Sequence, residues 1–459
     1  GMFGIPNSLA GLLELMIPAC LVLLSSRAVS WPAKILAAWL AAVFLFALVL
    51  TGSRGGWIAT GAALLAWPML GGGGWRKKII GLALVALLVG LGGVAAYRMS
   101  PAVRERAQPF LEGKFEASRP LIWRAGLKLW RDAPWLGTGA ASYNVLFDRH
   151  RPAGFLNEPD WTHNDYLNTL SDYGVAGFAL WLGAGAGLGG LGWRAVRRAR
   201  REPSAERGLF SLWRWKLGLW LGLLAFALHL FVDFHTKLPA LAFAAAIGAG
   251  LLLQDEPGLW RPWAAGRIAF GALVAAVALP LAFVVVPRYR AEAWRYEARR
   301  EIDRLALGKG NRDIVLPASI TRLEAAARLD PRNGQTWGDL AYATTLIWHV
   351  TRANPIPIGK RAEVFATKAL ALCPDWPAIY LWQGVALDMQ GRQAEGVRSF
   401  RRAIELAPHR PECHYYYAYH LSVFPERVME AIAVLDTCLS LDPGNSGALA
   451  LRQRILTNR

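Results

Sequence analysis

The chain has little of what most soluble enzymes use to bind nucleotides or metals. It contains no P-loop, no glycine-rich nucleotide fingerprint and no Asp-x-Asp pair, so nothing indicates a nucleotide-driven reaction. Its four cysteines form no Cys-x-x-Cys pair, and no group of His, Asp and Glu has the spacing of a metal site. We therefore predict neither a metal nor any other cofactor. Charged residues make up only 18% of the chain, which is low for a soluble protein.

Apolar residues are what the chain has in excess, at 54% of its 459 residues. A helix needs roughly 17–20 apolar residues to cross a bilayer. Eight runs before residue 287 reach this length: 9–25, 34–51, 55–71, 78–97, 174–193, 214–232, 238–254 and 267–286. We therefore predict an all-α membrane protein with about eight spans. The chain starts at Gly1 without an initiator Met and already in membrane-type sequence, so we expect it to be a fragment that lacks earlier helices.

Lysine and arginine predict which side of the membrane each connection faces. They gather in the first, third, fifth and seventh connections, at Arg27 and Lys34, at Arg76, Lys77 and Lys78, at Arg194, Arg197, Arg198, Arg200, Arg201 and Arg207, and at Arg261 and Arg267. These connections share one side if the spans alternate, and that side is cytoplasmic by the positive-inside rule. The rule also explains much of the net charge of +18, and no aromatic-basic signature points to nucleic acid. The long loop 98–173 and the tail 287–459 then lie on the outer side.

The fifth predicted span is rich in glycine, at Gly183, Gly185, Gly187, Gly189, Gly190 and Gly192. Small residues in a membrane helix let a neighbouring helix approach closely. We therefore expect this stretch to be a close helix-packing surface rather than a site.

The tail after residue 286 repeats a helix that ends just before a proline. The prolines are Pro331, Pro374, Pro408 and Pro443, separated by 43, 34 and 35 residues. A period of 34 residues with paired helices is typical of tetratricopeptide repeats. The unit 377–410 has the expected small, large, turn and stop residues: Gly384, Leu387, Gly391, Gly396, Phe400, Ala403 and Pro408. We predict an α-solenoid of three to four units, with an insertion near 351–359, that binds a protein or peptide; a helical cap without a partner is the alternative.

Three arginines on the outer side are candidates for binding phosphate. Arg54 lies between two spans, where the positive-inside rule disfavours arginine, and its flanking glycines would let a phosphate approach the backbone. Ser53 beside it is a secondary candidate. Arg119 and Arg124 belong to an amphipathic helix expected from about residue 117 to Trp130. Guanidinium groups offer paired donors to phosphate oxygens, although a basic face lying on lipid headgroups is the alternative.

The candidate general base is His163, in the last part of the outer loop and just before the fifth span. A neutral imidazole there could take a proton from a sugar hydroxyl. Asn164 and Asp165 are secondary candidates. Asp165 follows His163 by only two residues, so its side chain lies on a different helix face from that of His163. Asp233 and His235, in a short outer turn, are also secondary candidates.

Six short segments together resemble the O-antigen ligase/polymerase superfamily of bacterial envelope glycosyltransferases. They are GIPNSLA (4–10), SRG (53–55), SRPLIW (118–123), GTG (137–139), HNDYL (163–167) and GVAG (174–177). The resemblance covers about residues 1–250, and a repeat-bearing tail is a frequent companion in similar proteins. Two features depart from the family: Asp172 stands where members often have Glu, and members usually have more than eight spans.

The resemblance implies glycan transfer from an undecaprenyl-diphosphate carrier on the periplasmic side of the bacterial inner membrane, without metal or nucleotide. By this resemblance Arg54 and Arg119, extended by Arg124, hold the diphosphate, and His163 activates the acceptor hydroxyl for inverting attack. The regions would be helices 1–4 (1–97), a periplasmic catalytic loop (98–173), helices 5–8 (174–286) and periplasmic repeats (287–459). The acceptor stays open between lipid A–core, a growing polysaccharide and a protein. A non-catalytic scaffold that recruits partners through its repeats is the alternative class.

Overall fold

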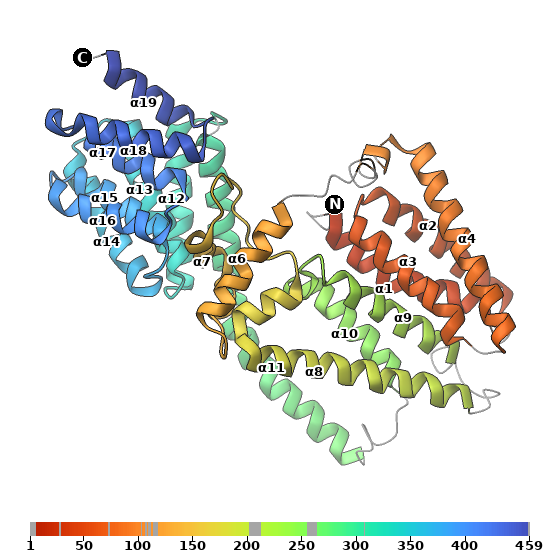
Figure 1. Cartoon of the computed structure of the whole chain (residues 1–459). Coiled ribbons are helices and arrows are strands. Elements are labelled where there is room, and N and C mark those ends of the chain that lie inside the picture. The colour runs from red at the N-terminus through yellow and green to blue at the C-terminus, as the bar shows by residue number, and fades with distance from the viewer. Residues whose placement is uncertain are drawn as a thin grey trace. The chain divides into compact units, whose positions relative to one another are not determined.

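The computed structural model describes residues 6–26, 29–71, 74–101, 103–105, 108, 112, 118–201, 213–254, 264–306 and 308–457. Within these ranges every regular element is a helix, which confirms the predicted all-α class (Figure 1). Contacts divide the chain into two compact units. The first contains residues 1–143 and 159–261, and the second contains 144–158 and 262–459. Gly4 and Ile5 of the first family-like segment, and Arg27, Arg207 and Arg261 of the basic connections, lie outside the described residues.

Each of the eight predicted spans falls on a helix. They are α1 (Pro6–Leu24), α2 (Trp31–Leu50), α3 (Arg54–Leu70), α4 (Trp75–Met99), α8 (Asp165–Arg201), α9 (Trp213–His229), α10 (Pro239–Leu253) and α11 (Ala264–Ala306). Five of them, α1, α2, α4, α8 and α11, are long and apolar enough to cross a membrane. The other three have 17, 17 and 15 residues, close to or just below the roughly 17-residue limit.

Helix α1 is the packing centre of the first unit and contacts α2, α3, α9 and α10. Two glycines of α9 allow its closest contact. A Cβ on Gly218 would lie 2.5 Å from Ala19 Cα, and one on Gly222 would lie 2.3 Å from Leu15 O. Backbones can approach this closely only where one helix has no side chain. The interior of the first unit therefore forms around α1 and α9, which also carry the buried Glu14 and His229.

Helix α8 is bent where the 134–139 segment of the long loop meets it. Gly174 has φ +63°, and a Cβ there would lie 2.3 Å from Trp135 O. A Cβ on Gly137 would lie 2.4 Å from the backbone of Asp172, so the two segments touch backbone to backbone. Only glycine tolerates both the positive φ and the contact. The 134–139 segment is thereby fixed to the first turns of α8.

Among the described residues, most of the glycine-rich stretch of α8 is not the packing surface that we predicted. Among the described residues, no atom lies within 4 Å of a Cβ built on five of its glycines, Gly183, Gly185, Gly187, Gly189 and Gly190. Two of the glycines do meet a neighbour: a Cβ on Gly192 would lie 2.5 Å from Leu252, and the carbonyl oxygen of Gly189 accepts a hydrogen bond from Trp220 Nε1 at 2.9 Å. The physical reason is that a small residue permits close packing but supplies no attraction that would bring a helix to it.

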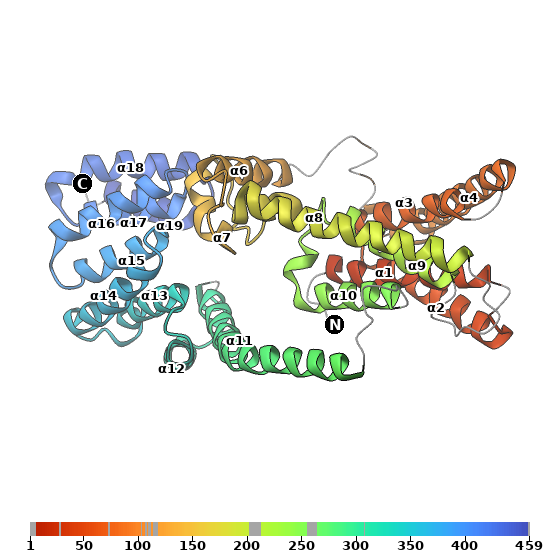
Figure 2. The same cartoon turned by 90° about the horizontal axis from the view of Figure 1, so that it is seen from below.

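The second unit contains the repeated helices. After α11 it has α12 (Arg312–Leu329), α13 (Gly334–Thr351), α14 (Pro355–Leu372), α15 (Pro377–Asp388), α16 (Gln393–Leu406), α17 (Pro411–Leu421), η4 (Pro425–Arg427), α18 (Val428–Leu441) and α19 (Ser446–Thr457). Consecutive helices pack on one another as hairpins (Figure 2). Helices α12, α14, α16 and α18 end two residues before the four predicted prolines, which confirms the repeat boundaries. The wider first spacing arises because α13 and α14 have 18 residues each, whereas α15 has 12 and α16 has 14.

Glycines set the close contacts of the 377–410 repeat. A Cβ on Gly384 would lie 2.7 Å from the ring of Phe400, which is buried. Gly391 has φ +74° in the turn between the two helices of the repeat. The small, large and turn positions predicted from the sequence are therefore confirmed in this unit.

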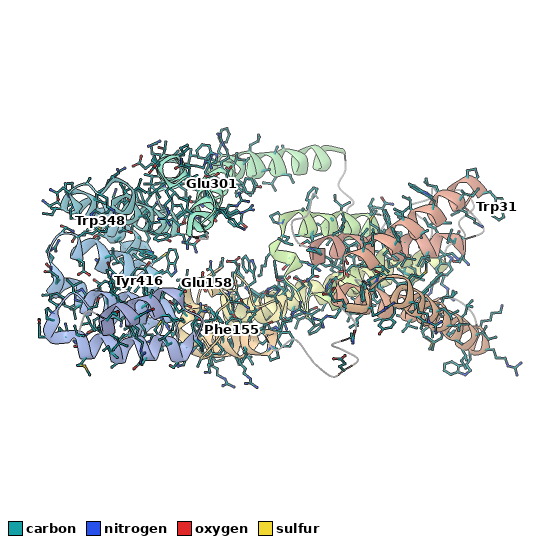
Figure 3. The ribbon with its side chains drawn as sticks, turned by 90° about the horizontal axis from the view of Figure 1, so that it is seen from above. Trp31, Phe155, Glu158, Glu301, Trp348 and Tyr416 are labelled. Atoms are coloured by element: carbon teal, nitrogen blue, oxygen red, sulfur yellow. The ribbon has the colours of Figure 1, made fainter. Side chains whose placement is uncertain are left out.

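A short piece of the long loop packs on the repeats. It contains most of α7 (Tyr143–Leu146) and all of η1 (Phe147–His150), and Figure 3 labels Phe155 and Glu158 in it. Arg410 Nη1 donates to Asp148 Oδ2 at 2.6 Å, and His409 Nδ1 donates to the carbonyl oxygen of Arg151 at 2.7 Å. Arg151 Nε also donates to Asp148 Oδ1 at 2.7 Å. A buried carboxylate held by two arginines thus joins residues 144–158 to the repeat domain.

Candidate functional site

The first unit buries a polar cluster among its apolar helices. Glu14 Oε2 lies 2.9 Å from His229 Nδ1, and His235 Nε2 lies 3.0 Å from the same nitrogen. Ser53 Oγ lies 3.4 Å from His229 Nε2, on the other side of the ring. All four residues are at most 2% exposed. Because buried polar groups in an apolar environment are costly, such a cluster marks a candidate functional site.

The turn between α9 and α10 completes the cluster. Asn7 Nδ2 donates to Asp233 Oδ2 at 2.6 Å, and the backbone N–H of Phe234 donates to Asp233 Oδ1 at 2.9 Å. His235 opens η3 (His235–Lys237) in the same turn. Burial lowers the pKa of His235, with a smaller contribution from neighbouring His229. The imidazole of His235 is therefore neutral near pH 7 and keeps a lone pair.

Glu14 and His229 were not among our predicted site residues. Glu14 is the only acidic residue of α1 and stands in its apolar middle. A carboxylate inside a membrane-type helix is expensive and is usually kept for function, so this signal was present in the sequence. His229 was hidden because it closes a predicted span, where an interfacial histidine is unremarkable.

The Ser53-Arg54-Gly55 segment lies against this cluster. Ser53 caps α3, accepting at its Oγ a hydrogen bond from Gly56 N at 3.2 Å. A Cβ on Gly55 would lie 2.6 Å from His229 Nε2, so the histidine ring rests on the glycine backbone. The half-buried Arg54 therefore starts α3 directly beside His229.

The predicted amphipathic helix is α6 (Ser118–Asp132). Its half-buried Arg119 is close enough to His229 to interact with it electrostatically. A Cβ on Gly126 would lie 3.1 Å from Thr162 Cγ2, so α6 packs on the segment that carries His163. Arg124 is exposed and lies about 140° around the helix from Arg119. Arg119, unlike Arg124, faces the cluster.

His163 lies two residues before α8 begins at Asp165. It has φ +51°, a left-handed conformation that is uncommon outside glycine, and its ring packs edge-on against Phe234 with the centroids 4.9 Å apart. Asn164 caps the helix, since its Oδ1 accepts a hydrogen bond from Leu167 N at 3.0 Å. His163 is thus held next to the Asp233–His235 turn.

Asp165 fastens the start of α8 to the same turn. Its backbone N–H donates to Leu230 O at 2.8 Å, and its Oδ2 accepts from Thr236 N at 2.8 Å. Its Oδ1 lies 3.9 Å from Lys237 Nζ. Asp172 is buried two residues before the bend at Gly174, where it accepts from Asn168 Nδ2 at 2.9 Å and Ala141 N at 3.3 Å. Both carboxylates position the loop around His163.

Residues 36–182 match the family model described as O-antigen ligase. We refer to this segment, about a third of the chain, as the ligase domain. It includes Ser53, Arg54, Arg119, His163 and Asp165, and the match supports a ligase- or polymerase-like role in glycan processing at a membrane. No curated protein matches the chain. Among solved structures, a thermophilic TPR protein of Thermus thermophilus matches with 17% identity and a TM-score of 0.31, over 47% of this chain and 91% of that one.

An apolar cavity of about 1030 Å³ is lined mostly by the ligase domain's helices α2, α3 and α4. Its lining includes Leu48, Trp57, Leu64, Val89 and Tyr97. Trp57 lies one turn after Arg54 on α3, so the cavity begins next to the Ser53-Arg54-Gly55 segment. The cavity therefore offers space for an apolar chain whose polar end reaches Arg54.

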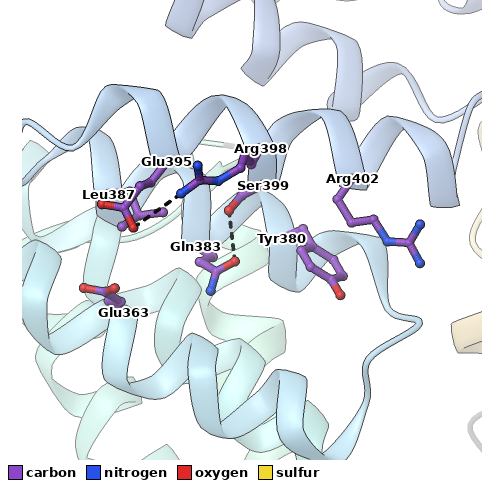
Figure 4. Close-up of a pocket in the computed structure, with 8 residues that line it drawn as sticks. All are labelled: Glu363, Tyr380, Gln383, Leu387, Glu395, Arg398, Ser399 and Arg402. Atoms are coloured by element: carbon purple, nitrogen blue, oxygen red, sulfur yellow. Dashed lines mark hydrogen bonds and ion pairs between the residues drawn. The ribbon is translucent and has the colours of Figure 1, made fainter.

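A second, polar pocket of about 280 Å³ lies in the repeat domain between α14, α15 and α16 (Figure 4). Tyr380, Gln383, Arg398 and Arg402 are among its lining residues. Gln383 Oε1 accepts a hydrogen bond from Ser399 Oγ at 2.9 Å. Its donors and acceptors suit a polar peptide, as expected for such a repeat stack.

Proposed function

We propose that the protein transfers a glycan from an undecaprenyl-diphosphate carrier to an acceptor on the periplasmic side of a bacterial inner membrane. The observation that carries this proposal is the packing of three ligase-domain segments around one turn. Ser53-Arg54-Gly55 lies against His229, Arg119 interacts with His229, and His163 packs on Phe234. The loop 98–173 and the repeats 287–459 would be periplasmic, an orientation supported by the basic residues of the opposite connections.

The donor would bind with its polyprenyl chain in the apolar cavity and its diphosphate at Arg54 and Arg119. Guanidinium groups form paired, charge-assisted hydrogen bonds with phosphate oxygens. The start of α3 adds the positive end of a helix dipole beside Arg54. Arg124, on the exposed side of α6, would meet the phosphates only at their periphery.

In the proposed step, His163 takes the proton of an acceptor hydroxyl as that oxygen attacks the anomeric carbon of the donor sugar. The bond between the anomeric carbon and the phosphate oxygen breaks, and undecaprenyl diphosphate leaves with the electron pair. The attack comes from the face opposite the leaving group, so the anomeric configuration inverts. Arg54 and Arg119 stabilise the charge of the leaving diphosphate, which is the usual largest contribution in such sites. The step itself uses no metal or nucleotide.

The other predicted site residues would position these groups. Asn164 and Asp165 fix the start of α8, Asp233 fixes the turn through Asn7, and Ser53 caps α3. His235 contacts His229 rather than the loop histidine. The acceptor would be a growing polysaccharide or the lipid A–core, and a protein acceptor, as in a protein O-oligosaccharyltransferase, is the alternative.

The decisive experiment compares His163→Ala with wild type in membranes supplied with lipid-linked glycan. We expect loss of product with normal expression and membrane insertion, and a smaller loss for Arg54→Lys than for Arg54→Ala. His409→Ala is a matched control in the repeat domain and should leave transfer intact. Undiminished product in His163→Ala would contradict the proposal. If the protein is instead a scaffold, deleting 287–459 should remove its function and Arg54 should be replaceable.

A further inference from the structure

Three buried side chains from three elements point donor atoms at one place. Glu14 comes from α1, His229 from the end of α9 and His235 from η3. One ligand atom of each lies within 4.8 Å of the other two, and the residues are 0%, 1% and 0% exposed. Two imidazole nitrogens with one carboxylate oxygen form a common donor set for a divalent transition metal.

Hydrogen bonding alone leaves this cluster under-satisfied. His229 Nδ1 has two neighbours, Glu14 Oε2 at 2.9 Å and His235 Nε2 at 3.0 Å. A ring nitrogen carries either one hydrogen or one lone pair, so it can form one good hydrogen bond but not two. In addition, Glu14 Oε1 and His235 Nδ1 are buried without a hydrogen-bond partner among the described residues. Such buried groups are rare and costly.

Two acidic side chains are buried in and beside this cluster. Glu14 and Asp233 are both buried and close enough to interact electrostatically. In the described part of the chain, Glu14 is bonded only by His229, and Asp233 only by Asn7 and the Phe234 backbone. Neither carboxylate pairs with a lysine or arginine there. A buried carboxyl group is either protonated or offset by a cation, and a metal ion is one such cation.

Two glycines leave room for the two imidazole rings. A Cβ on Gly11 would lie 2.9 Å from His235 Nε2, and one on Gly55 would lie 2.6 Å from His229 Nε2. The rings are therefore seated on the backbones of α1 and α3, which fixes their positions before any ligand binds. Preorganised donors of this kind lower the cost of binding.

We infer that Glu14, His229 and His235 bind one divalent transition-metal ion, with zinc as the first candidate. Imidazole suits zinc, copper, iron and nickel, whereas the all-oxygen preference of magnesium and calcium disfavours them here. The ion cross-links α1, α9 and the turn that holds His163 and Asp165. It is no part of the glycan-transfer step, so the two proposals stand or fall separately.

The direct test is the metal content of the full chain. The protein is purified in detergent with a tag free of histidine, and zinc, copper, iron and nickel are measured by mass spectrometry. We expect about one zinc ion per chain, the stoichiometry of a single three-ligand site. Background levels of all four metals in wild type would overturn the inference and leave a hydrogen-bonded cluster with a protonated histidine.

Matched variants then locate the ion. Glu14→Gln and His235→Asn should bring the metal content to background, and both keep the approximate size of the side chain. His163→Ala and His414→Gln, which change histidines outside the cluster, should keep it. Full metal content in the double variant of Glu14 and His235 would mean an adventitious ion only and would overturn the assignment.

Removing the metal from wild-type protein and adding it back tests the site without variants, which could fail to fold. Wild-type protein treated with a chelator should lose several degrees of thermal midpoint and regain them with Zn²⁺, because a ligand that binds only the folded state stabilises it. Co²⁺ in place of Zn²⁺ should give the visible absorption of a low-coordinate nitrogen and oxygen site. A thermal midpoint that changes neither with the chelator nor with Zn²⁺ would contradict the inference. Loss of transfer in His163→Ala with zinc retained would confirm that the two sites are separate.

Discussion

The two units of the molecule pair several of their buried carboxylates differently. In the repeat unit, Asp339 is 1% exposed and accepts hydrogen bonds from Arg295 at 2.9 Å and Arg299 at 2.8 Å. Asp148 is held in the same manner by Arg151 and Arg410. In the ligase-domain unit, Glu14 and Asp233 face histidine and asparagine instead.

This difference distinguishes buried carboxylates that stabilise the fold from buried carboxylates that can still bind a proton, a cation or a substrate. An arginine satisfies a buried carboxylate with fixed, paired hydrogen bonds, and the pair then serves as a joint. A carboxylate that faces neutral imidazoles keeps its charge for a proton, a cation or a substrate. Perturbed, incompletely paired groups of this kind gather at functional sites. The following predictions test whether the contrast holds.

The largest expected effect comes from removing a carboxylate that joins two arginines. Asp148→Ala leaves Arg410 and Arg151 without their shared partner, so we expect about 3–5 kcal/mol of destabilisation in the second unit. Denaturant unfolding measures it, and hydrogen exchange should show faster exchange in residues 144–158. Asp436→Ala is the control, because its ion pair with Arg452 is 55% and 42% exposed and should contribute no more than about 1 kcal/mol. Equal destabilisation by the two variants would show that the buried pairs of Asp148 do not stabilise the fold more than an exposed ion pair does.

The next effect concerns activity rather than stability. Gly55→Ala places a methyl group 2.6 Å from His229 Nε2 and 2.7 Å from Val232 Cγ2, so the Ser53-Arg54-Gly55 segment must shift. A displacement of about 1 Å near a reacting group can reduce the rate about 100-fold. We expect a loss of this size in a glycan-transfer assay, with the protein still folded. Gly61→Ala on the same helix is the control, since its nearest neighbour, Val89, is 3.9 Å away. A Gly55→Ala enzyme of normal activity would show that His229 does not depend on this contact.

These contacts also show how much of the structure could be predicted from the sequence. Apolar runs and proline stops predicted the helices and the repeat boundaries, because both are local patterns. Glu14 gave a local signal that we did not use, a single acid in an apolar span. The pairing of Asp148 with Arg410 could not be predicted, because the residues are 262 positions apart and no sequence pattern near either residue indicates its partner. The glycines of α8 misled us because a small residue fits both a crowded and an open surface.

A pair of glycine substitutions tests that last point at a smaller scale. Gly384→Ala puts a Cβ 2.7 Å from the buried Phe400 ring and should destabilise the repeat unit by about 1–3 kcal/mol. Gly187→Ala in α8 meets nothing within 4 Å among the described residues and should stabilise the helix by up to about 1 kcal/mol, because alanine is the better helix former. Thermal unfolding of both variants measures whether each substitution lowers or raises the stability. A destabilising Gly187→Ala would mean that another helix does cover this face of α8.

The smallest effect is the pH response of a buried histidine with a different kind of partner. His414 Nε2 donates to Pro408 O at 2.8 Å, which fixes the neutral tautomer, and burial lowers the pKa of His414. The unfolded chain therefore takes up a proton near pH 6.5 while the folded repeats still resist it. Stability of the second unit should fall as the pH decreases below about 6.5 and level off once the folded pKa is passed. His414→Gln, which can keep the bond to Pro408 O but does not titrate, should remove that slope between about pH 7 and pH 5.5. An unchanged slope in His414→Gln would assign it to other titratable groups of the second unit.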